Sequence, residues 1–316
     1  MVDAVITWVD GDDPAHAAKR QRFTGGAVHP NARSATRFAS RGEIGYGVWS
    51  ILTFCPFVDR VFVVTDDQRP QAVEALFADR PDWRDRVRIV DHRDLYREHA
   101  DLLPVFSSRS IETMLFRIPD LAEHFIYLND DIFIGRPVAR DLFFRDGRPV
   151  LQGRLHRFPN PVLARLKAWV KPGPARAGFK DAQQRAARLV GVQDRYFLAE
   201  HRPHPMRRST MEAFFDARPD LLRAQAAPRF RSADQFSPIG LAHHLELLAG
   251  ATVVPPSPSG YLKPTSRPDK RAAVLDALRQ GRLDTICIQS LDAMAPADQD
   301  AVVAALDAWV AAGSTA

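Results

Sequence analysis

Two adjacent carboxylates interrupt an apolar run near the middle of the chain. The stretch HFIYLNDDIFIG, residues 124–135, places Asn129, Asp130 and Asp131 inside what is otherwise typical of a buried strand. Buried carboxylates are costly unless a cation or several hydrogen-bond donors neutralise them. A turn closed by an Asx cap is the alternative, although the apolar run resumes at once. Carboxylate oxygens suit Mg²⁺ or Mn²⁺, so Asp130 and Asp131 are candidate metal ligands.

Two further predicted strands also end in acidic residues. Asp10 follows the first of them, and Asp66 follows the second. In an open α/β sheet, ligands bind beyond the carboxyl ends of the strands. We therefore expect the three acidic strand ends to converge on one crevice.

The first of these ends, TWVDGDDP at residues 7–14, is also a turn motif. Asp-Gly and Asp-Pro pairs mark tight turns, so the acids alternatively shape the turn and cap the next helix. Trp8 either packs in the core or stacks on a base or sugar. Trp8 and Gly11 are candidate substrate contacts beside Asp10.

A stiff basic loop offers groups that recognise anions. Residues 201–208, HRPHPMRR, contain His201 and His204, and Arg231 follows in RFRSADQ. Arginine binds phosphate through two parallel hydrogen bonds, and histidine moves protons near neutral pH. An ordinary basic surface loop is the alternative. Zinc is not favoured, because no cysteine or third histidine stands at ligand spacing.

Strands and helices alternate around these candidates. The hydrophobic pattern predicts strands at 2–10, 61–65, 87–91 and a pair within 124–135, with helices at 42–54, 71–79 and 111–118. This order is typical of βαβ units. The predicted fold class is α/β, with a Rossmann-like, mostly parallel sheet flanked by helices.

Composition is that of an ordinary globular protein. The chain has 316 residues, 46% hydrophobic and 26% charged, with a net charge of +5. One domain over residues 1–316 is expected, with a basic helical insert at about 151–195. PVLARLKAWVK, residues 161–171, is an amphipathic helix candidate there. The insert is either an exposed helical segment or a surface for a polyanionic acceptor or anionic lipid.

Several protein classes and locations are disfavoured. Neither GxGxxG nor GxxxxGK[ST] nor GxSxG occurs, which argues against dehydrogenases, P-loop kinases and α/β-hydrolases. No nucleic-acid partner is expected. Cys55 and Cys287 lie in apolar contexts and are expected to be buried thiols of a reducing compartment. The N-terminus lacks the features of a signal peptide, and no apolar run approaches the ~20 residues of a membrane span. A cytoplasmic location follows, with peripheral contact at the inner face of the membrane left open.

Four blocks of the sequence, in order, resemble the Stealth family. They are residues 2–14, residues 37–70 with 103–135, residues 201–236, and a degenerate fourth block, DTICIQSLD, at 284–292. The family includes capsular polysaccharide phosphotransferases. The resemblance implies an enzyme that transfers a hexose-1-phosphate from a nucleotide-sugar donor to a hydroxyl of a glycan acceptor. A phosphodiester forms and a nucleoside monophosphate leaves. The resemblance further implies a role in capsule or cell-surface polysaccharide synthesis.

The resemblance also assigns residues to the site. His201 and Arg231 match the third-block histidine and arginine of the family's active site. Arg231 would stabilise phosphate charge, and His201 would be either the base for the acceptor hydroxyl or a phosphate contact. Asp10 is the alternative candidate for the base. Matched second-block positions, expected to shape the donor pocket, are Arg37, Glu43, Arg109, Glu112 and Arg117. Salt bridges on the surface or within helices are the alternative role for those five.

The fourth block departs from the family pattern of Cys-apolar-Asn-Asp. Here Gln289 and Ser290 follow Ile288, and Asp292 comes two residues later. Two alternatives therefore accompany the transferase hypothesis. One is a metal-dependent glycosyltransferase, which also needs an acidic strand end. The other is a catalytically silent polysaccharide-binding protein.

Overall fold

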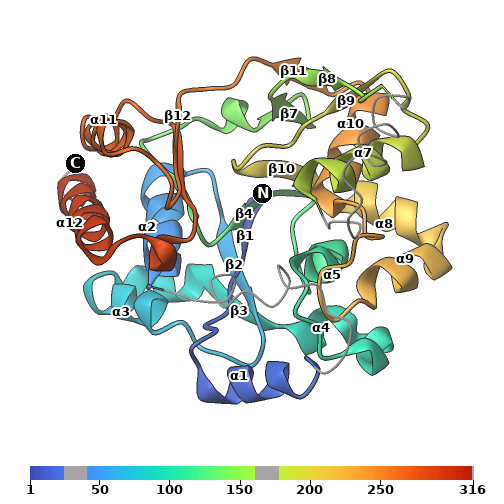
Figure 1. The fold of residues 1–316 in the computed structure, drawn as a ribbon, viewed down its shortest axis with the longest axis horizontal. Helices are drawn as coiled ribbons and strands as arrows, with labels where there is room; N and C mark the ends of the chain where they lie inside the picture. The colour runs from blue at the N-terminus through green and yellow to red at the C-terminus, as the bar shows by residue number, and fades with distance from the viewer. Residues whose placement is uncertain (25–40, 161–177, 315–316) are drawn as a thin grey trace, which may run out of the picture.

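A five-stranded sheet forms the centre of the molecule in the computed structural model, which describes residues 1–24, 41–160 and 178–314 (Figure 1). Its strand order is β10-β4-β1-β2-β3. The four strands β1 to β4 are parallel, and β10 is antiparallel to β4. The strands are β1 Val2–Thr7, β2 Arg60–Thr65, β3 Val87–Asp91, β4 His124–Asn129 and β10 His204–Arg207. The predicted α/β class with a mostly parallel, Rossmann-like sheet is confirmed.

The direction in which the chain adds strands reverses at β1. From β1 the chain adds β2 and then β3 on one side, and it returns to place β4 on the other side. In the register, Thr7 of β1 lies beside Asn129 of β4 and Val64 of β2. Crossovers leave β1 in opposite directions here, so a crevice opens beyond the carboxyl ends of β1 and β4.

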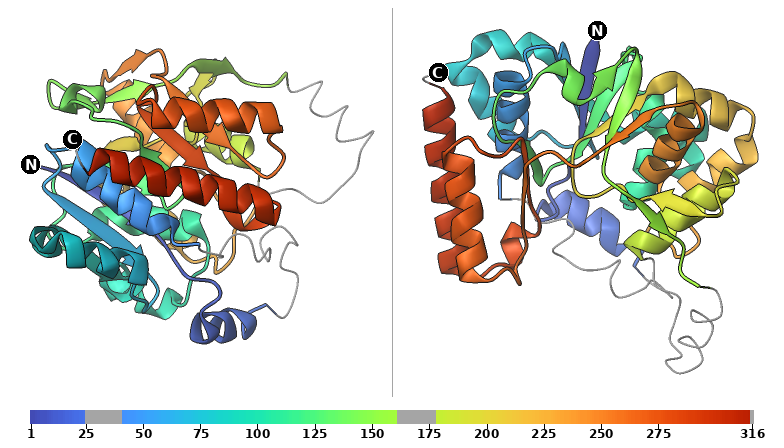
Figure 2. Two further views of the ribbon diagram at one scale, coloured as in Figure 1. Left: turned by 90° about the vertical axis from the view of Figure 1, so that its left-hand side faces the viewer. Right: turned by 90° about the horizontal axis from the view of Figure 1, so that it is seen from above.

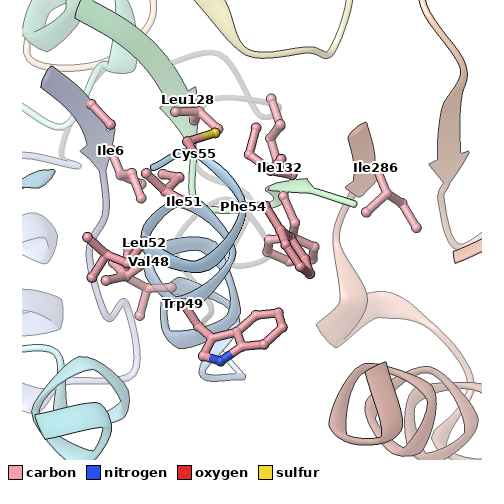
Figure 3. Close-up of a cluster of buried hydrophobic side chains, with 14 of the residues drawn as sticks. Ile6, Val48, Trp49, Ile51, Leu52, Phe54, Cys55, Leu128, Ile132 and Ile286 are labelled. Atoms are coloured by element: carbon pink, nitrogen blue, oxygen red, sulfur yellow. The ribbon is translucent and has the colours of Figure 1, made fainter. Parts of the chain in front are cut away.

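Alternating side chains supply the two faces of this sheet. Ala4 and Ile6 of β1 join one core cluster, and Val5 between them joins the other. Strands buried on both faces are expected to be mainly apolar, as the centres of β2 and β4 are, although β1 also buries the carboxylate of Asp3. In Figure 3, side chains of helix α2 pack together with Ile6 and Leu128 of the strands.

Helices cover both faces of the sheet, as the opposite sides of Figure 1 and the turned views of Figure 2 show. The first face carries α2 Glu43–Phe54, α3 Gln71–Asp79, α11 Pro268–Arg279 and α12 Pro296–Gly313. The second carries α4 His92–Tyr96, α5 Ser108–Met114, α8 Arg208–Asp216, α9 Pro219–Ala226 and α10 Pro238–Leu248. The short helix α1, Pro14–Gln21, follows β1.

Smaller sheets extend the central one. After β4 the chain makes a two-residue turn and enters a second sheet, of order β12-β13-β5. Its strands are β5 Ile132–Ile134, β12 Ser259–Leu262 and β13 Thr285–Ile288. The others are β11 Thr252–Val254 with β7 Arg148–Gln152 and β6 Phe144–Arg145, and β8 Leu155–Arg157 with β9 Arg195–Phe197.

The stretch predicted as a helical insert at about 151–195 is only partly helical in its described part. It contributes strands β8 and β9 and the helix α7, Phe179–Leu189. Helix α7 packs against α10 and buries its alanine face, so it belongs to the body of the fold. The basic helix candidate at 161–171 lies outside the described residues.

Two further expectations concern the cysteines and the membrane. Both cysteines are free and buried, as predicted. Among the described residues, no helix has the length and apolarity needed to span a bilayer.

Candidate active site

A pocket of about 550 Å³ opens beyond the carboxyl ends of β1 and β4. Its floor is formed by the last residues of β1 and by the turn from β4 to β5. Helices α5 and α7 and the end of β13 supply walls. Segments far apart in the sequence therefore meet where the strand order reverses.

The acid pair Asp130–Asp131 is the turn between β4 and β5 and lines this pocket. Burial raises the pKa of both carboxyl groups, and the charge of Asp131 raises that of Asp130 further. The Cys287 thiol donates to Asp131 Oδ2 over 3.6 Å, while Asp131 Oδ1 is buried with no hydrogen-bond partner among the described residues. The Ile288 N–H donates to the Asp131 carbonyl at 2.9 Å and ties the turn to β13. An unsatisfied carboxylate oxygen in a pocket is a position for a cation.

Glu43 and Asp292 are among the other carboxylates that line the same pocket. Glu43 begins α2, and Asp292 follows β13. Burial raises the pKa of each, and the charges of Asp292 and Asp131 raise that of Glu43 further. Among the described residues no three His, Cys, Asp or Glu side chains form a cage able to hold a metal. The donor set instead fits Mg²⁺, which takes one or two carboxylates and completes its shell with water and substrate phosphate oxygens.

A buried cation is part of another wall. The Arg231 Nη2 donates to Ser108 Oγ at 2.6 Å, and burial lowers the Arg231 pKa while the charge of Glu112 raises it. Burial raises the pKa of Glu112, and Arg231 opposes this. Arg231 Nε has no hydrogen-bond partner in the part of the chain that the structure describes. The guanidinium therefore keeps a donor for a ligand.

The two loop histidines occupy different environments. His201 is half-buried and stacks on the rings of both Phe179 and Tyr261. His204 on β10 stacks on Tyr127, and burial lowers its pKa to about 3. His204 is therefore neutral at physiological pH and is unsuited to carrying a positive charge towards a phosphate.

Two family models match parts of this chain. The family model "Stealth protein CR1, conserved region 1" matches residues 2–27, and "Stealth protein CR2, conserved region 2" matches residues 37–150. The chain belongs to the Stealth family. Both the end of β1 and the acid turn fall within the matched regions.

Curated Stealth-like relatives carry phosphotransferase names. An exopolysaccharide phosphotransferase of Streptomyces coelicolor is 35% identical over 310 residues, which is 97% of this chain and 54% of the relative. The capsular polysaccharide phosphotransferase LcbA of Aeromonas hydrophila is 36% identical over 148 residues, 46% of this chain and 38% of the relative. The chain thus spans about half, or less, of the length of these relatives.

Solved structures of similar shape are more distant. The galactosyltransferase LgtC, with donor and acceptor sugar analogues, aligns with a TM-score of 0.47 at 10% identity and covers 99% of this chain and 95% of that one. The bifunctional glycosyltransferase WbbM gives 0.46 at 11%, over 96% and 49%. Similarity at this level carries no inference about activity.

Some of the residues predicted for the Stealth site do line the pocket. They are Trp8, Glu43, Arg109, Glu112, Asp130, Asp131, His201, His204 and Arg231. Arg109, however, donates to the carbonyls of Ser232, Gln235 and Gly178, so those bonds hold the surrounding loops in place. Trp8 is buried and borders the pocket.

Other predicted residues are not among those that line the pocket. Asp10 accepts from the Asp12 N–H at 2.9 Å, and Gly11 is buried in the same turn, whose Asp13 caps α1. The turn interpretation of TWVDGDDP is therefore the one that the structure shows.

The remaining two predicted contacts have partners of their own. Asp66 forms an ion pair with Lys19 at 2.9 Å, and Arg117 pairs with Glu98 and donates to the Leu95 carbonyl. The expected convergence of all three acidic strand ends on one pocket was wrong in this respect, because Asp10 and Asp66 are not among the residues that line it. Arg37 lies outside the described residues.

The pocket also contains residues that sequence reasoning did not select. Tyr127 bonds to the Asn129 side chain at 2.8 Å and fixes that amide beside the acid pair. Phe179 enters from α7, within the stretch predicted as an insert. Gln289 and Ser290 also line the pocket, beside Asp292. The degenerate fourth block was the sequence signal for these last three.

Proposed function

We propose that the chain transfers a sugar-1-phosphate from a nucleotide-sugar to a hydroxyl group of a glycan acceptor. The observation that carries this proposal is the pocket itself, which combines an unsatisfied carboxylate at Asp131 with a buried guanidinium at Arg231. Phosphoryl transfer depends on positioning and on neutralising phosphate charge, which these groups provide. The phosphotransferase names of relatives at 35% identity support the same class.

In this reaction the acceptor oxygen bonds to the β-phosphorus. The bond from that phosphorus to the oxygen that it shares with the α-phosphorus breaks, and the nucleoside monophosphate leaves. Arg231 binds non-bridging phosphate oxygens through its free Nε. A divalent cation held by Asp130 and Asp131 would neutralise pyrophosphate charge. His201 takes the hydroxyl proton or contacts the phosphate. His201 lines the pocket and Asp10 does not, which favours His201 as the base.

The wider role is part of the proposal. Relatives named for exopolysaccharide and capsular polysaccharide suggest capsule or cell-surface polysaccharide synthesis, with a hexose-1-phosphate as the group transferred. A cytoplasmic site with peripheral membrane contact is the location that suits such a donor.

Product analysis distinguishes the candidate activities. The chain is incubated with UDP-, CDP- and GDP-sugars, Mg²⁺ or Mn²⁺ and glycan acceptors, and the products are followed by phosphorus NMR. A nucleoside monophosphate and a new phosphodiester signal support the proposal. Release of a nucleoside diphosphate would instead show glycosyl transfer, and binding of glycan without turnover would show a silent binding protein.

Metal removal gives a first prediction. We expect EDTA to abolish turnover and added Mg²⁺ or Mn²⁺ to restore it, because the carboxylates alone repel the pyrophosphate. Isothermal titration of the apo protein with Mn²⁺ provides a readout independent of activity. Full turnover in EDTA, or no Mn²⁺ binding even with the nucleotide present, contradicts the metal assignment.

Substitution of His201 gives a second prediction. We expect His201→Ala to lose turnover by about 10²-fold or more, the range for a general base, while nucleotide binding is largely kept. Turnover and the nucleotide dissociation constant are measured on the same preparation. If binding is lost instead, His201 is a phosphate contact. His156→Ala, on the β8–β9 ribbon, is the matched control.

A further inference from the structure

The imidazole of His201 stacks against two aromatic rings. The Phe179 ring lies 5.2 Å from it, centroid to centroid, with 13° between the planes. The Tyr261 ring lies 5.3 Å away, at 15°. Three nearly parallel rings from α7, the loop before β10 and β12 thus form one stack.

Other contacts hold the two outer rings. The Tyr261 hydroxyl donates to Gln289 Oε1, and Lys270 Nζ lies over the Tyr261 ring, 5.6 Å from its centroid. On the other side, Arg109 Nη2 donates at 2.9 Å to the carbonyl of Gly178, the residue before Phe179. Each outer ring is therefore anchored to a separate part of the fold.

This stack restricts how the imidazole can be used. Two near-parallel rings stacked against the imidazole leave its edge, where both nitrogen atoms lie, for contacts in the pocket. Rotation about the Cβ–Cγ bond of His201 would force the imidazole into Phe179 or Tyr261. His201 lines the same pocket as Asp130 and Asp131, so this edge can face the acid pair.

We propose that Phe179 and Tyr261 are positioning residues, which clamp the His201 imidazole so that a ring nitrogen faces the reacting groups in the pocket. Gln289 accepts a hydrogen bond from the Tyr261 hydroxyl beside the clamp. The inference rests on the role proposed above for His201.

Proton NMR tests the clamp without any turnover. The ring protons of His201 are assigned by their loss in His201→Gln. Protons that lie over neighbouring aromatic faces resonate upfield, so we expect the His201 signals upfield of those of exposed histidines. Tyr261→Leu and Phe179→Leu each move them downfield, while Tyr261→Phe keeps the ring and the shift. Phe158→Leu is the matched control, because the Phe158 ring packs on Tyr196 and not on His201.

Kinetics provide the second readout. We expect Tyr261→Leu to lower kcat by about 10-fold or more with little change in the donor KM, because misplacement of a reacting group costs rate. Tyr261→Phe keeps most of kcat. Unshifted His201 signals in the wild-type protein, or unchanged signals in both leucine variants, overturn the clamp. A higher donor KM together with a lower kcat in Tyr261→Leu, with the NMR shift kept, also overturns it.

The two proposals fail separately. If the wild-type chain turns over no nucleotide-sugar while the ring shifts respond as expected, the proposed reaction is wrong and the clamp stands. Phe179 is 45% exposed, so its leucine variant is not expected to disturb folding. Circular dichroism of every variant verifies this.

Discussion

Replacing Asp131 with asparagine is expected to lower turnover by at least about 100-fold while the protein stays folded. The substitution removes the charge of a carboxylate whose Oδ1 has no partner in the described structure, so the site loses stabilisation worth several kcal/mol at the phosphate. The Cys287 thiol can still donate to an amide oxygen at this position. Steady-state kinetics at saturating donor and metal measure the loss, and Mn²⁺ titration measures the weakened metal binding.

The stability of the same variant separates function from folding. A buried charge without a full set of donors costs stability, so its removal should leave the melting temperature of the metal-free protein at least as high. Asp67→Asn is the matched control, an exposed aspartate at the end of β2 that pairs with Arg93. Wild-type rates in Asp131→Asn, or equal losses in Asp67→Asn, contradict the site.

Replacing Arg231 with lysine is expected to reduce turnover by about 100-fold or more. The guanidinium offers a planar fork that matches phosphate, whereas an ammonium offers a single charge. Removal of one donor to a developing charge costs about 10²–10³ in kcat. Lysine still balances Glu112, which is close enough for Arg231 to lower its pKa. The fold should therefore be kept, and the loss should fall mainly on kcat.

Arg229→Lys is the control for this substitution. Arg229 lies two residues away, is exposed, and stacks over Phe23. We expect it to retain turnover. If Arg231→Lys has wild-type kcat, or if only the melting temperature falls, then Arg231 stabilises the fold around Glu112 and does not bind phosphate. Arg231→Ala should unfold more readily, because it leaves Glu112 buried without its cation.

Strand and helix positions were predictable because apolar periodicity is local. The predicted ranges 71–79 and 87–91 match α3 and β3 to the residue. The helix predicted at 111–118 begins earlier, at Ser108, and its last turn tightens to a 3-10 turn at Leu115–Arg117. The acid pair was also identifiable, since two carboxylates in an apolar run conflict with burial unless they have a function.

Partners that come from distant segments were not predictable. Asp10 and Asp66 looked equivalent to Asp130 in sequence, yet Asp10 accepts a turn N–H, Asp66 pairs with Lys19, and neither is among the residues that line the pocket. Phe179 and Tyr261 carry no motif, and their stacking on His201 follows from how α7 and β12 pack. Local pattern specifies which face a residue takes, but tertiary packing decides what it meets.

The acid turn is held from both sides because its two flanking strands belong to different sheets. β4 is hydrogen-bonded inside the central sheet, and β5 is paired with β13. A two-residue turn between two paired strands has little freedom to relax, so Asp130 and Asp131 cannot separate to relieve their repulsion. Cation binding should therefore require little ordering of the chain and should lock the two sheets together. Backbone hydrogen exchange in β5 and β13 would slow when Mg²⁺ binds, at positions that the ion never touches.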